Sequence, residues 1–315
     1  MRLILLNILF MGTPDFAERS LEKLINSNHD IIGVVTKQDK PKGRGMKMIS
    51  SPVKDLAILN NIPVYQPEKI KENTEFIEEI RKLKPDIICV VAYGKILSKE
   101  LLEIPKYGCI NLHGSILPKY RGAAPIQWAV LNGDKTTGVT TIYMNEKMDA
   151  GDIIFKEEVE IGEYETTGEL WNRLSIIGAE LLLKTVNEIE KGSAPRTPQT
   201  GEYTLAPMLE KDISKINWSN SAQKIKDLVR GLNPIMGAYT IYNSKKIKIW
   251  KINILNETSD MQPGYIIESD SKKGLKIQTN DRVIEVLEIQ GENSRRMPIT
   301  DYLRGNQLKV GTILE

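Results

Sequence analysis

The order of apolar segments along the chain is the feature that most constrains its fold. Through the first half, short continuous apolar runs alternate with segments in which apolar residues recur at helical spacing. The runs include 3–10, 30–36 and 87–92, and the helical segments include 75–83 and 124–131. Strands that are apolar on both faces and separated by amphipathic helices are typical of a parallel sheet covered on both sides. The sequence therefore predicts an α/β domain with a Rossmann-like, doubly wound, mostly parallel sheet.

The N-terminal segment MRLILLNILFM is interpreted as the first strand of this sheet. A secretory signal peptide is the alternative, but Asn7 interrupts the apolar run and no small-residue cleavage site follows. The next residues predict a helix start instead, with Thr13 as N-cap, Pro14 at the first helical position and Asp15 in the first turn.

The pattern changes after Gly151. Residues 152–161 alternate like a strand and 167–190 are predicted to form one long helix, followed by a linker, 191–206, rich in proline, glycine and polar residues. Beyond it the sequence predicts one helix and several short strands, typical of a small OB-like β-barrel domain over 207–315. The helix is expected at 221–231 and the strands at 238–242, 246–254, 264–269, 274–279 and 282–290.

Composition sets limits on function. Of the 315 residues 41% are apolar and 27% charged, and the formal net charge is only +2, so nucleic-acid binding would depend on local basic patches. Residues 206–315 carry 17 Lys and Arg against 13 Asp and Glu, a small excess that permits RNA binding. Cys89 and Cys109 lie in expected buried strands, and no apolar run is long enough to cross a membrane. We expect a soluble, monomeric protein of the reducing cytoplasm.

Chemistry is expected at the end of the strand that contains Asn111 and His113. Residues two apart on a strand point the same way, so the amide and the imidazole share a face where parallel sheets bind ligands. Together they can stabilise an oxyanion and handle a proton. Asp149, in the turn MDAGD, is the candidate carboxylate beside them, whereas Asp152 is interpreted as turn chemistry. The other histidine, His29, is expected in a surface turn, and no cluster has metal-ligand spacing, so no metal is predicted.

The segment GCINLHGSILPKYRGAAPIQWAVLNGDKTTGVTTIYMNEKMDAGDII resembles the catalytic core of formyltransferases that use 10-formyltetrahydrofolate. The resemblance implies that Asn111, His113 and Asp149 are catalytic. It also implies folate contacts from the family's SLLP loop, which stands here as Ser115, Ile116, Leu117 and Pro118 with one conservative change. Whether Leu117-Pro118 is cis or trans stays open.

Two further blocks resemble the methionyl-tRNA formyltransferase branch of that family. They are FMGTPDFA at 10–17 and the basic segment VVTKQDKPKGRGMKMISSPVK at 34–54, where Lys-Gln-Asp replaces the usual Gln-Pro-Asp. The resemblance is weaker over about the last 75 residues. It implies 1–190 as the catalytic domain, 207–315 as a tRNA-binding domain, and the formyl donor 10-formyltetrahydrofolate and initiator methionyl-tRNA as partners. The expected tRNA contacts are Lys40, Lys42, Arg44 and Lys47.

Other functions compete with this one. The nearest is formylation of a small amine, either glycinamide ribonucleotide or a nucleotide-linked amino sugar. The first needs only about 200 residues, since one domain of typical size suffices, and leaves the C-terminal domain unexplained. A formyl-folate hydrolase and a non-catalytic RNA-binding module are more distant alternatives. A nicotinamide dehydrogenase is set aside because Gly12 stands alone, without the Gly-x-Gly-x-x-Gly pattern.

Overall fold

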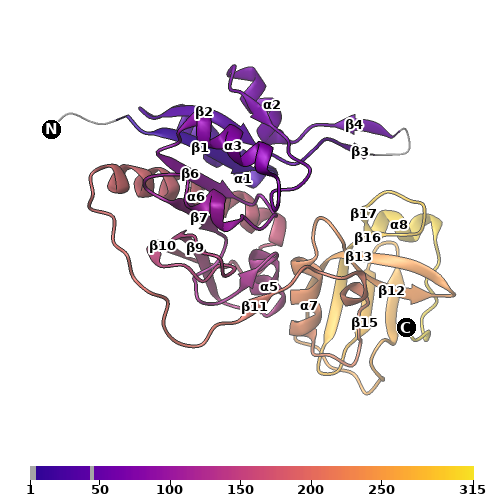
Figure 1. Cartoon of the computed structure of the whole chain (residues 1–315). Coiled ribbons are helices and arrows are strands. Elements are labelled where there is room, and N and C mark those ends of the chain that lie inside the picture. Colours follow the sequence, from indigo (N-terminus) through magenta and orange to yellow (C-terminus); the bar gives the residue numbers. More distant parts are fainter. Residues whose placement is uncertain (1–4, 43–45) are drawn as a thin grey trace. The chain divides into compact units, whose positions relative to one another are not determined.

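The computed structural model describes residues 5–42 and 46–315 (Figure 1). Contacts divide the chain into two compact units. The first comprises Met1–Pro125, Thr136–Val159 and Trp171–Pro207, and the second comprises Ile126–Lys135, Glu160–Leu170 and Met208–Glu315. Within the described ranges, no helix is long and apolar enough to cross a membrane.

The first unit contains a seven-stranded sheet in the order β10-β9-β7-β6-β1-β2-β5. From β7 through β6, β1 and β2 to β5 all pairings are parallel, and β9 is antiparallel to β7. The predicted doubly wound, mostly parallel sheet is therefore confirmed. The strands are β1 (Asn7–Gly12), β2 (Asp30–Val35), β5 (Val64–Tyr65), β6 (Ile87–Val91), β7 (Cys109–His113), β9 (Thr136–Tyr143) and β10 (Ile153–Glu160).

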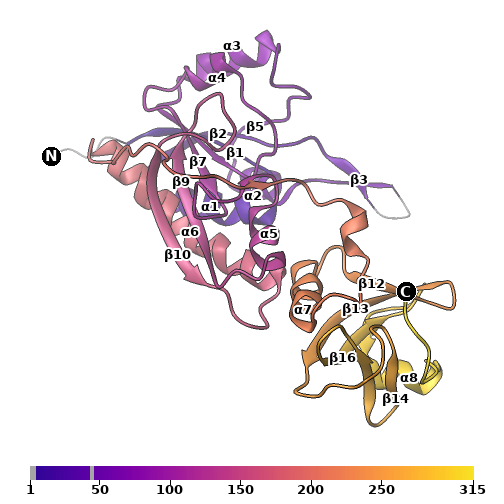
Figure 2. The same cartoon turned by 90° about the horizontal axis from the view of Figure 1, so that it is seen from below.

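Helices cover both faces of this sheet because its strands are apolar on both sides. On one face Leu9 and Met11 of β1 share a core cluster with Phe76 and Ile80 of α3. On the other, α6 crosses near α1, where the rings of Phe16 and Trp171 lie 5.0 Å apart (Figure 2). The first six α-helices of the chain are α1 (Asp15–Ile25), α2 (Pro52–Leu59), α3 (Thr74–Leu83), α4 (Lys99–Leu102), α5 (Pro125–Leu131) and α6 (Thr167–Glu190).

Two local predictions in this unit are wrong. Helix α1 has Pro14 as its N-cap, without a side-chain cap bond, so Thr13 lies outside the helix. His29 does lie in the turn before β2, but only 9% of it is exposed. Its Nδ1 accepts a hydrogen bond from the backbone N–H of Leu6, and its Nε2 lies 2.9 Å from Oδ1 of Asn187 in α6. A helix more than 150 residues later in the chain covers this turn, which local sequence does not indicate.

The second unit contains an antiparallel sheet in the order β12-β13-β16-β15-β14, and β17 also pairs with β16. The five predicted strands and the predicted helix are confirmed to within two residues at each end, whereas β17 and α8 were not predicted. The elements are η1 (Lys211–Ser214), α7 (Ala222–Gly231), β12 (Ala238–Tyr242), β13 (Lys245–Ile254), β14 (Ile266–Asp270), β15 (Gly274–Gln278), β16 (Val283–Gln290), β17 (Met297–Pro298) and α8 (Ile299–Gly305).

The last residues of the chain join the two outer strands of this sheet. Ile241 of β12 exchanges both backbone hydrogen bonds with Glu315, at 2.9 and 3.2 Å. On the other side, the N–H of Ile266 in β14 donates to the carbonyl of Thr312, and the N–H of Leu314 donates to Gly264. The C-terminal segment therefore covers the edges of β12 and β14.

Candidate active site

The candidate site lies one strand from the point where the sheet changes its winding direction. From β1 the chain continues to β2 and β5 on one side, and β6 returns to pair with β1 on the other, so the topological switch point lies between β1 and β6, with β7 next to β6. Asn111 is the third residue of β7 and His113 is the last. Their side chains project to the same face, as predicted, because strand residues alternate.

Both side chains reach one carboxylate. Nδ2 of Asn111 donates to Oδ1 of Asp149 at 3.4 Å, and Nδ1 of His113 lies 3.7 Å from the same oxygen. The other oxygen, Oδ2, accepts the backbone N–H of Gly122 at 2.9 Å. The side chains of His113 and Asp149 are only 5% and 14% exposed. The fold thus brings together the three residues predicted for catalysis. The site is partly shielded from solvent, and electrostatic interactions there are stronger than in water.

The hydrogen bond at the far side of the imidazole determines its tautomer. Nε2 of His113 lies 2.8 Å from the carbonyl oxygen of Tyr120. A carbonyl only accepts, so Nε2 carries a hydrogen, and Nδ1 is the ring nitrogen that faces Asp149. Tyr120, a residue that sequence reasoning did not select, thus holds the hydrogen on Nε2. Nδ1 is left to receive or donate a proton beside the carboxylate.

A tight turn after β9 presents Asp149. Its φ is 49°, a left-handed conformation that is uncommon for a non-glycine residue. Gly151 follows where a Cβ atom would lie 1.6 Å from the carbonyl oxygen of Tyr143, so only glycine fits. Asp152 accepts a hydrogen bond from Nε of Arg196 at 2.8 Å, a partner 44 residues later in the chain and not the local turn contact that the sequence suggested.

The predicted folate loop follows β7 directly. Ser115 and Leu117 are fully buried, and their polar groups serve the loop itself. Oγ of Ser115 donates to the carbonyl of Lys119 at 2.6 Å, and the N–H of Leu117 donates to Oγ1 of Thr140 at 3.2 Å. The Leu117-Pro118 peptide bond is cis. Of the four predicted residues, Ile116 and Pro118 are partly exposed, so these two are available to a ligand.

The linker segment also reaches the site, which sequence reasoning missed. β11 (Leu205–Ala206) pairs in parallel with β8 (Arg121–Gly122). Gly122 has a φ of 130°, and a Cβ atom there would lie 2.6 Å from the carbonyl oxygen of Ala206. Only glycine allows this approach, and it aims the Gly122 N–H at Asp149. The glycine in RGAA was the available signal, but its partner strand lies more than 80 residues later.

Comparison with known families and proteins shows which family the chain belongs to. Residues 6–186 match the formyl transferase family model, and residues 208–307 match the model of the formyl transferase C-terminal domain. The chain belongs to the formyl transferase family. Family membership agrees with the resemblance seen in the sequence and leaves no support for a nicotinamide dehydrogenase.

Relatives of this family match nearly the whole chain. The methionyl-tRNA formyltransferase of Clostridioides difficile is 52% identical over 310 residues, covering 98% of this chain and 100% of the relative. That of Alkaliphilus oremlandii is 49% identical and covers 98% and 99%. Among solved structures, the sugar 3N-formyl transferase WlaRD has a TM-score of 0.67 at 21% identity, covering 93% of this chain and 100% of that one. HypX from Aquifex aeolicus, solved with tetrahydrofolic acid, has a TM-score of 0.65 at 16% identity, covering 98% and 50%.

The basic segment after β2 forms a hairpin that was not predicted. β3 (Lys40–Lys42) and β4 (Lys47–Ile49) are antiparallel, and Lys42 pairs with Lys47. Arg44, predicted to contact tRNA, lies outside the described residues, as do the side chains of Lys42 and Lys47. Lys40 is exposed. The structure thus supplies a two-stranded support for the predicted basic loop.

Positive charge gathers at the base of this hairpin. Partial burial lowers the pKa of Lys37, and the positive charge of Lys40 lowers it further. The pKa of Lys95 is lowered by partial burial and then by Lys37. Close lysines with lowered pKa values favour an anion between them, because a negative charge relieves their repulsion. Asp39 is already paired with Lys54, at 2.7 Å.

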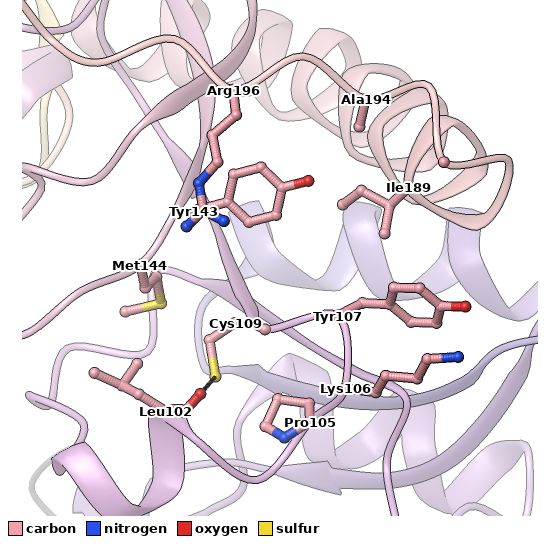
Figure 3. Close-up of a pocket in the computed structure, with 12 residues that line it drawn as sticks. Leu102, Pro105, Lys106, Tyr107, Cys109, Tyr143, Met144, Ile189, Ala194 and Arg196 are labelled. Carbon is pink, nitrogen blue, oxygen red and sulfur yellow. Dashed lines mark hydrogen bonds between the residues drawn. The ribbon is translucent and has the colours of Figure 1, made fainter.

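A cavity of about 490 Å³ lies at the start of β7, the opposite end from His113 (Figure 3). Cys109 and Tyr143 line it, and Arg196 stacks 4.4 Å from the centre of the Tyr143 ring. Burial raises the pKa of the Cys109 thiol to about 12, so the thiol stays protonated and unreactive. Both cysteines are free and buried. The cavity therefore carries no nucleophile for the predicted chemistry.

Proposed function

We propose that this protein transfers the formyl group of 10-formyltetrahydrofolate to the α-amine of methionyl initiator tRNA. The observation that carries the proposal is a chain-long similarity to methionyl-tRNA formyltransferases, at 52% and 49% identity over 98% of the chain. The convergence of Asn111, His113 and Asp149 at the end of β7 supports it with a site suited to acyl transfer. The protein would act as a cytoplasmic monomer.

The donor would bind along the loop after β7. Ile116 and Pro118, both partly exposed, offer an apolar surface for a pterin ring, while the buried contacts of Ser115 and Leu117 keep the loop in place. That orientation presents the formyl carbon to Asn111 and His113. The proposed fit is with a folate, since HypX, which shares the fold, was solved with tetrahydrofolic acid.

The proposed reaction is a direct transfer. The amine nitrogen bonds to the formyl carbon, and the carbonyl oxygen becomes an oxyanion that accepts hydrogen bonds from Nδ2 of Asn111 and from protonated Nδ1 of His113. Collapse breaks the bond to the folate N10, which takes up a proton while the amine gives one up. Asp149, beside both groups, would accept the amine proton through a water and stabilise the imidazolium. An oxyanion donor typically contributes ~2.7–4 kcal/mol, and proton transfer about 10²–10⁴-fold in rate.

The acceptor would be held by two regions. Strands β3 and β4 form the basic hairpin, and Lys37 and Lys95 add positive charge at its base, which suits the phosphates of an acceptor stem. The proposed division of labour is catalysis in 1–190, a linker at 191–206 and tRNA contacts from 207–315. The C-terminal region carries a small positive excess and an OB-like sheet, a surface used elsewhere for single-stranded nucleic acid.

The deciding experiment compares acceptors. Purified protein with 10-formyltetrahydrofolate is offered methionyl initiator tRNA, methionyl elongator tRNA, glycinamide ribonucleotide and a nucleotide-linked amino sugar. Rapid formylation of the initiator alone is expected. Transfer only to a small amine would retain the chemistry and refute the acceptor. Tight tRNA binding without transfer to any amine would instead favour a non-catalytic RNA-binding protein.

A further inference from the structure

We propose that Gln199, in the segment that follows α6, is a positioning residue that clamps the turn carrying Asp149 and keeps its carboxylate in place for catalysis. The inference rests on the proposed function, since it assigns a task within that reaction. It concerns a residue outside the motifs that identify the site.

Every polar atom of the Gln199 side chain is used. Its Nε2 donates to the carbonyl oxygens of Asp149 and Gly151, each at 2.8 Å. Its Oε1 accepts from Nε and Nη2 of Arg121, at 3.2 and 2.7 Å. Gln199 therefore spans the turn on both sides of Ala150, and a charged donor orients its amide.

Arg121 links this clamp to the carboxylate itself. Its guanidinium lies 4.7 Å from the centre of the Tyr203 ring, which restrains the side chain from the other side. Its neighbour Gly122 donates its backbone N–H to Oδ2 of Asp149. The segment 199–206 thus holds the backbone of Asp149 through Gln199 and its carboxylate through the β8–β11 pairing.

Asp149 needs such support because its backbone conformation is strained. A non-glycine residue with a φ of 49° persists only where surrounding contacts stabilise it. Asn111 and His113 sit on a strand, whereas Asp149 sits in a turn with exposed residues 145–148 before it. Displacement of a catalytic group by about 1 Å can lower the rate about 10²-fold. Loss of the clamp should therefore affect catalysis more than folding.

The test uses the full-length protein with Gln199→Leu and Gln199→Glu. Leucine removes the amide at similar volume, and glutamate keeps an acceptor for Arg121 but turns a carboxylate towards two carbonyl oxygens. Thr200→Val, at the exposed next residue, is the control. Single-turnover formylation should fall about 10- to 100-fold in both Gln199 variants, with KM for the donor and the tRNA within about twofold of wild type, because the binding surfaces are intact.

A double-mutant cycle separates positioning from a general structural role. In the Asp149→Asn background, Gln199→Leu should lower the rate no further, since its effect passes through that carboxylate. Equal losses in both backgrounds, or a wild-type rate for Gln199→Leu, would overturn the clamp. If Gln199→Leu fails to fold, Arg121→Lys, which keeps one donor, replaces it in the same cycle.

Hydrogen exchange tests the role of Gln199 without depending on formylation activity. Amide hydrogen exchange over residues 144–152 should become faster in Gln199→Leu and stay at the wild-type rate in Thr200→Val. Wild-type protein that formylates no amine would refute the proposed function, while faster exchange would still support the clamp. Unchanged exchange would refute the clamp whatever the enzyme transfers.

Discussion

At the scale of single residues, the site is built around unusual backbone conformations. Tyr120, Gly122 and Asp149 all have positive φ values, 61°, 130° and 49°. Each aims one group: the Tyr120 carbonyl meets His113, and the Gly122 N–H meets the carboxylate of Asp149. For the non-glycine residues Tyr120 and Asp149 such a conformation costs about 1–3 kcal/mol each, and such residues gather at sites where a group must point in one direction. Glycine adopts a positive φ without this cost.

The two acids of the MDAGD turn should differ sharply. Asp149→Asn keeps an acceptor for the Gly122 N–H but removes the charge beside His113, so the single-turnover rate should fall about 10²–10⁴-fold. Asp152→Asn weakens only a largely exposed pair with Arg196 and should change the rate less than about threefold. Rapid-quench formylation with both variants checks this, and similar rates in the two would contradict the assignment of Asp149.

Gly122→Ala tests the close approach of the linker segment. The added Cβ would lie 2.6 Å from the Ala206 carbonyl, so β8 and β11 should separate and the Gly122 N–H should leave Asp149. We expect about 1–3 kcal/mol of lost stability and a marked drop in kcat.

Gly192→Ala is the matched control, since its φ of 71° is also positive while no atom lies within 4 Å of the added Cβ. Thermal unfolding and formylation rates distinguish the two. Retention of full activity by Gly122→Ala would show that this N–H does not position the carboxylate.

At the scale of elements, short segments of the chain pair with the backbone beside longer strands and helices. β7 places Asn111 and His113 on one face, but β8 and β11, of two residues each, complete the surroundings of Asp149. In the second unit, the last residues cover the free edges of β12 and β14. In both places a few backbone hydrogen bonds decide whether an edge is open or closed.

The C-terminal segment should contribute measurably to stability. Leu314 is 5% exposed and belongs to the core of the second unit, so Leu314→Ala should cost about 2–5 kcal/mol. Its neighbour Ile313 is 45% exposed, and Ile313→Ala should cost less than about 1 kcal/mol. Urea unfolding followed by tryptophan fluorescence measures both, because Trp218 lies in the same core. Equal costs would mean that the segment does not pack as described.

The lysines at the base of the hairpin should give tRNA binding a characteristic pH dependence. The pKa of Lys37 is lowered, so this side chain loses its charge at a lower pH than an ordinary lysine. The affinity for tRNA should therefore begin to fall at a lower pH than it would if Lys37 had the pKa of an ordinary exposed lysine. Lys37→Arg stays charged throughout and should shift this fall to higher pH, whereas Lys82→Arg, at an exposed position, should leave it unchanged. Filter binding at constant ionic strength measures the profiles.

At the scale of the whole molecule, charge is distributed locally. With a net charge of only +2, we expect attraction to RNA to depend on the hairpin and on the small positive excess after residue 206. The tRNA contribution is thus separable from the chemistry at β7. A small amine acceptor would bypass the hairpin, whereas a tRNA would depend on it.

The salt dependence of tRNA binding tests this separation. Arg44→Ala and Lys40→Ala should each reduce the slope of log affinity against log salt concentration by about 1. Single-turnover rates at saturating tRNA should remain near those of wild type, because neither residue belongs to the catalytic group. An unchanged salt slope combined with a large loss of rate would place the hairpin in the chemistry instead.

The sequence predicted a site residue when its role depends on neighbouring residues in the sequence, and missed it when its partner is distant in the sequence. Asn111 and His113 followed from strand periodicity and motif, because both properties are local. Tyr120, Gly122 and Gln199 were missed, because each acts through a partner distant in sequence or through its backbone. His29 was placed at the surface for the same reason, since the helix that covers it comes much later in the chain.

By itself, the sequence determined the order of strands and helices, the doubly wound sheet and the strands of the second unit, and it pointed to the residues that we propose for catalysis. Hydrophobic periodicity and turn chemistry carry that information within short windows. Only the tertiary structure decided which nitrogen of His113 faces Asp149, that the segment after α6 clamps the Asp149 turn, and that the last residues close the edges of the second sheet. These depend on backbone groups that every residue carries, so no residue type marks them until the chain has folded.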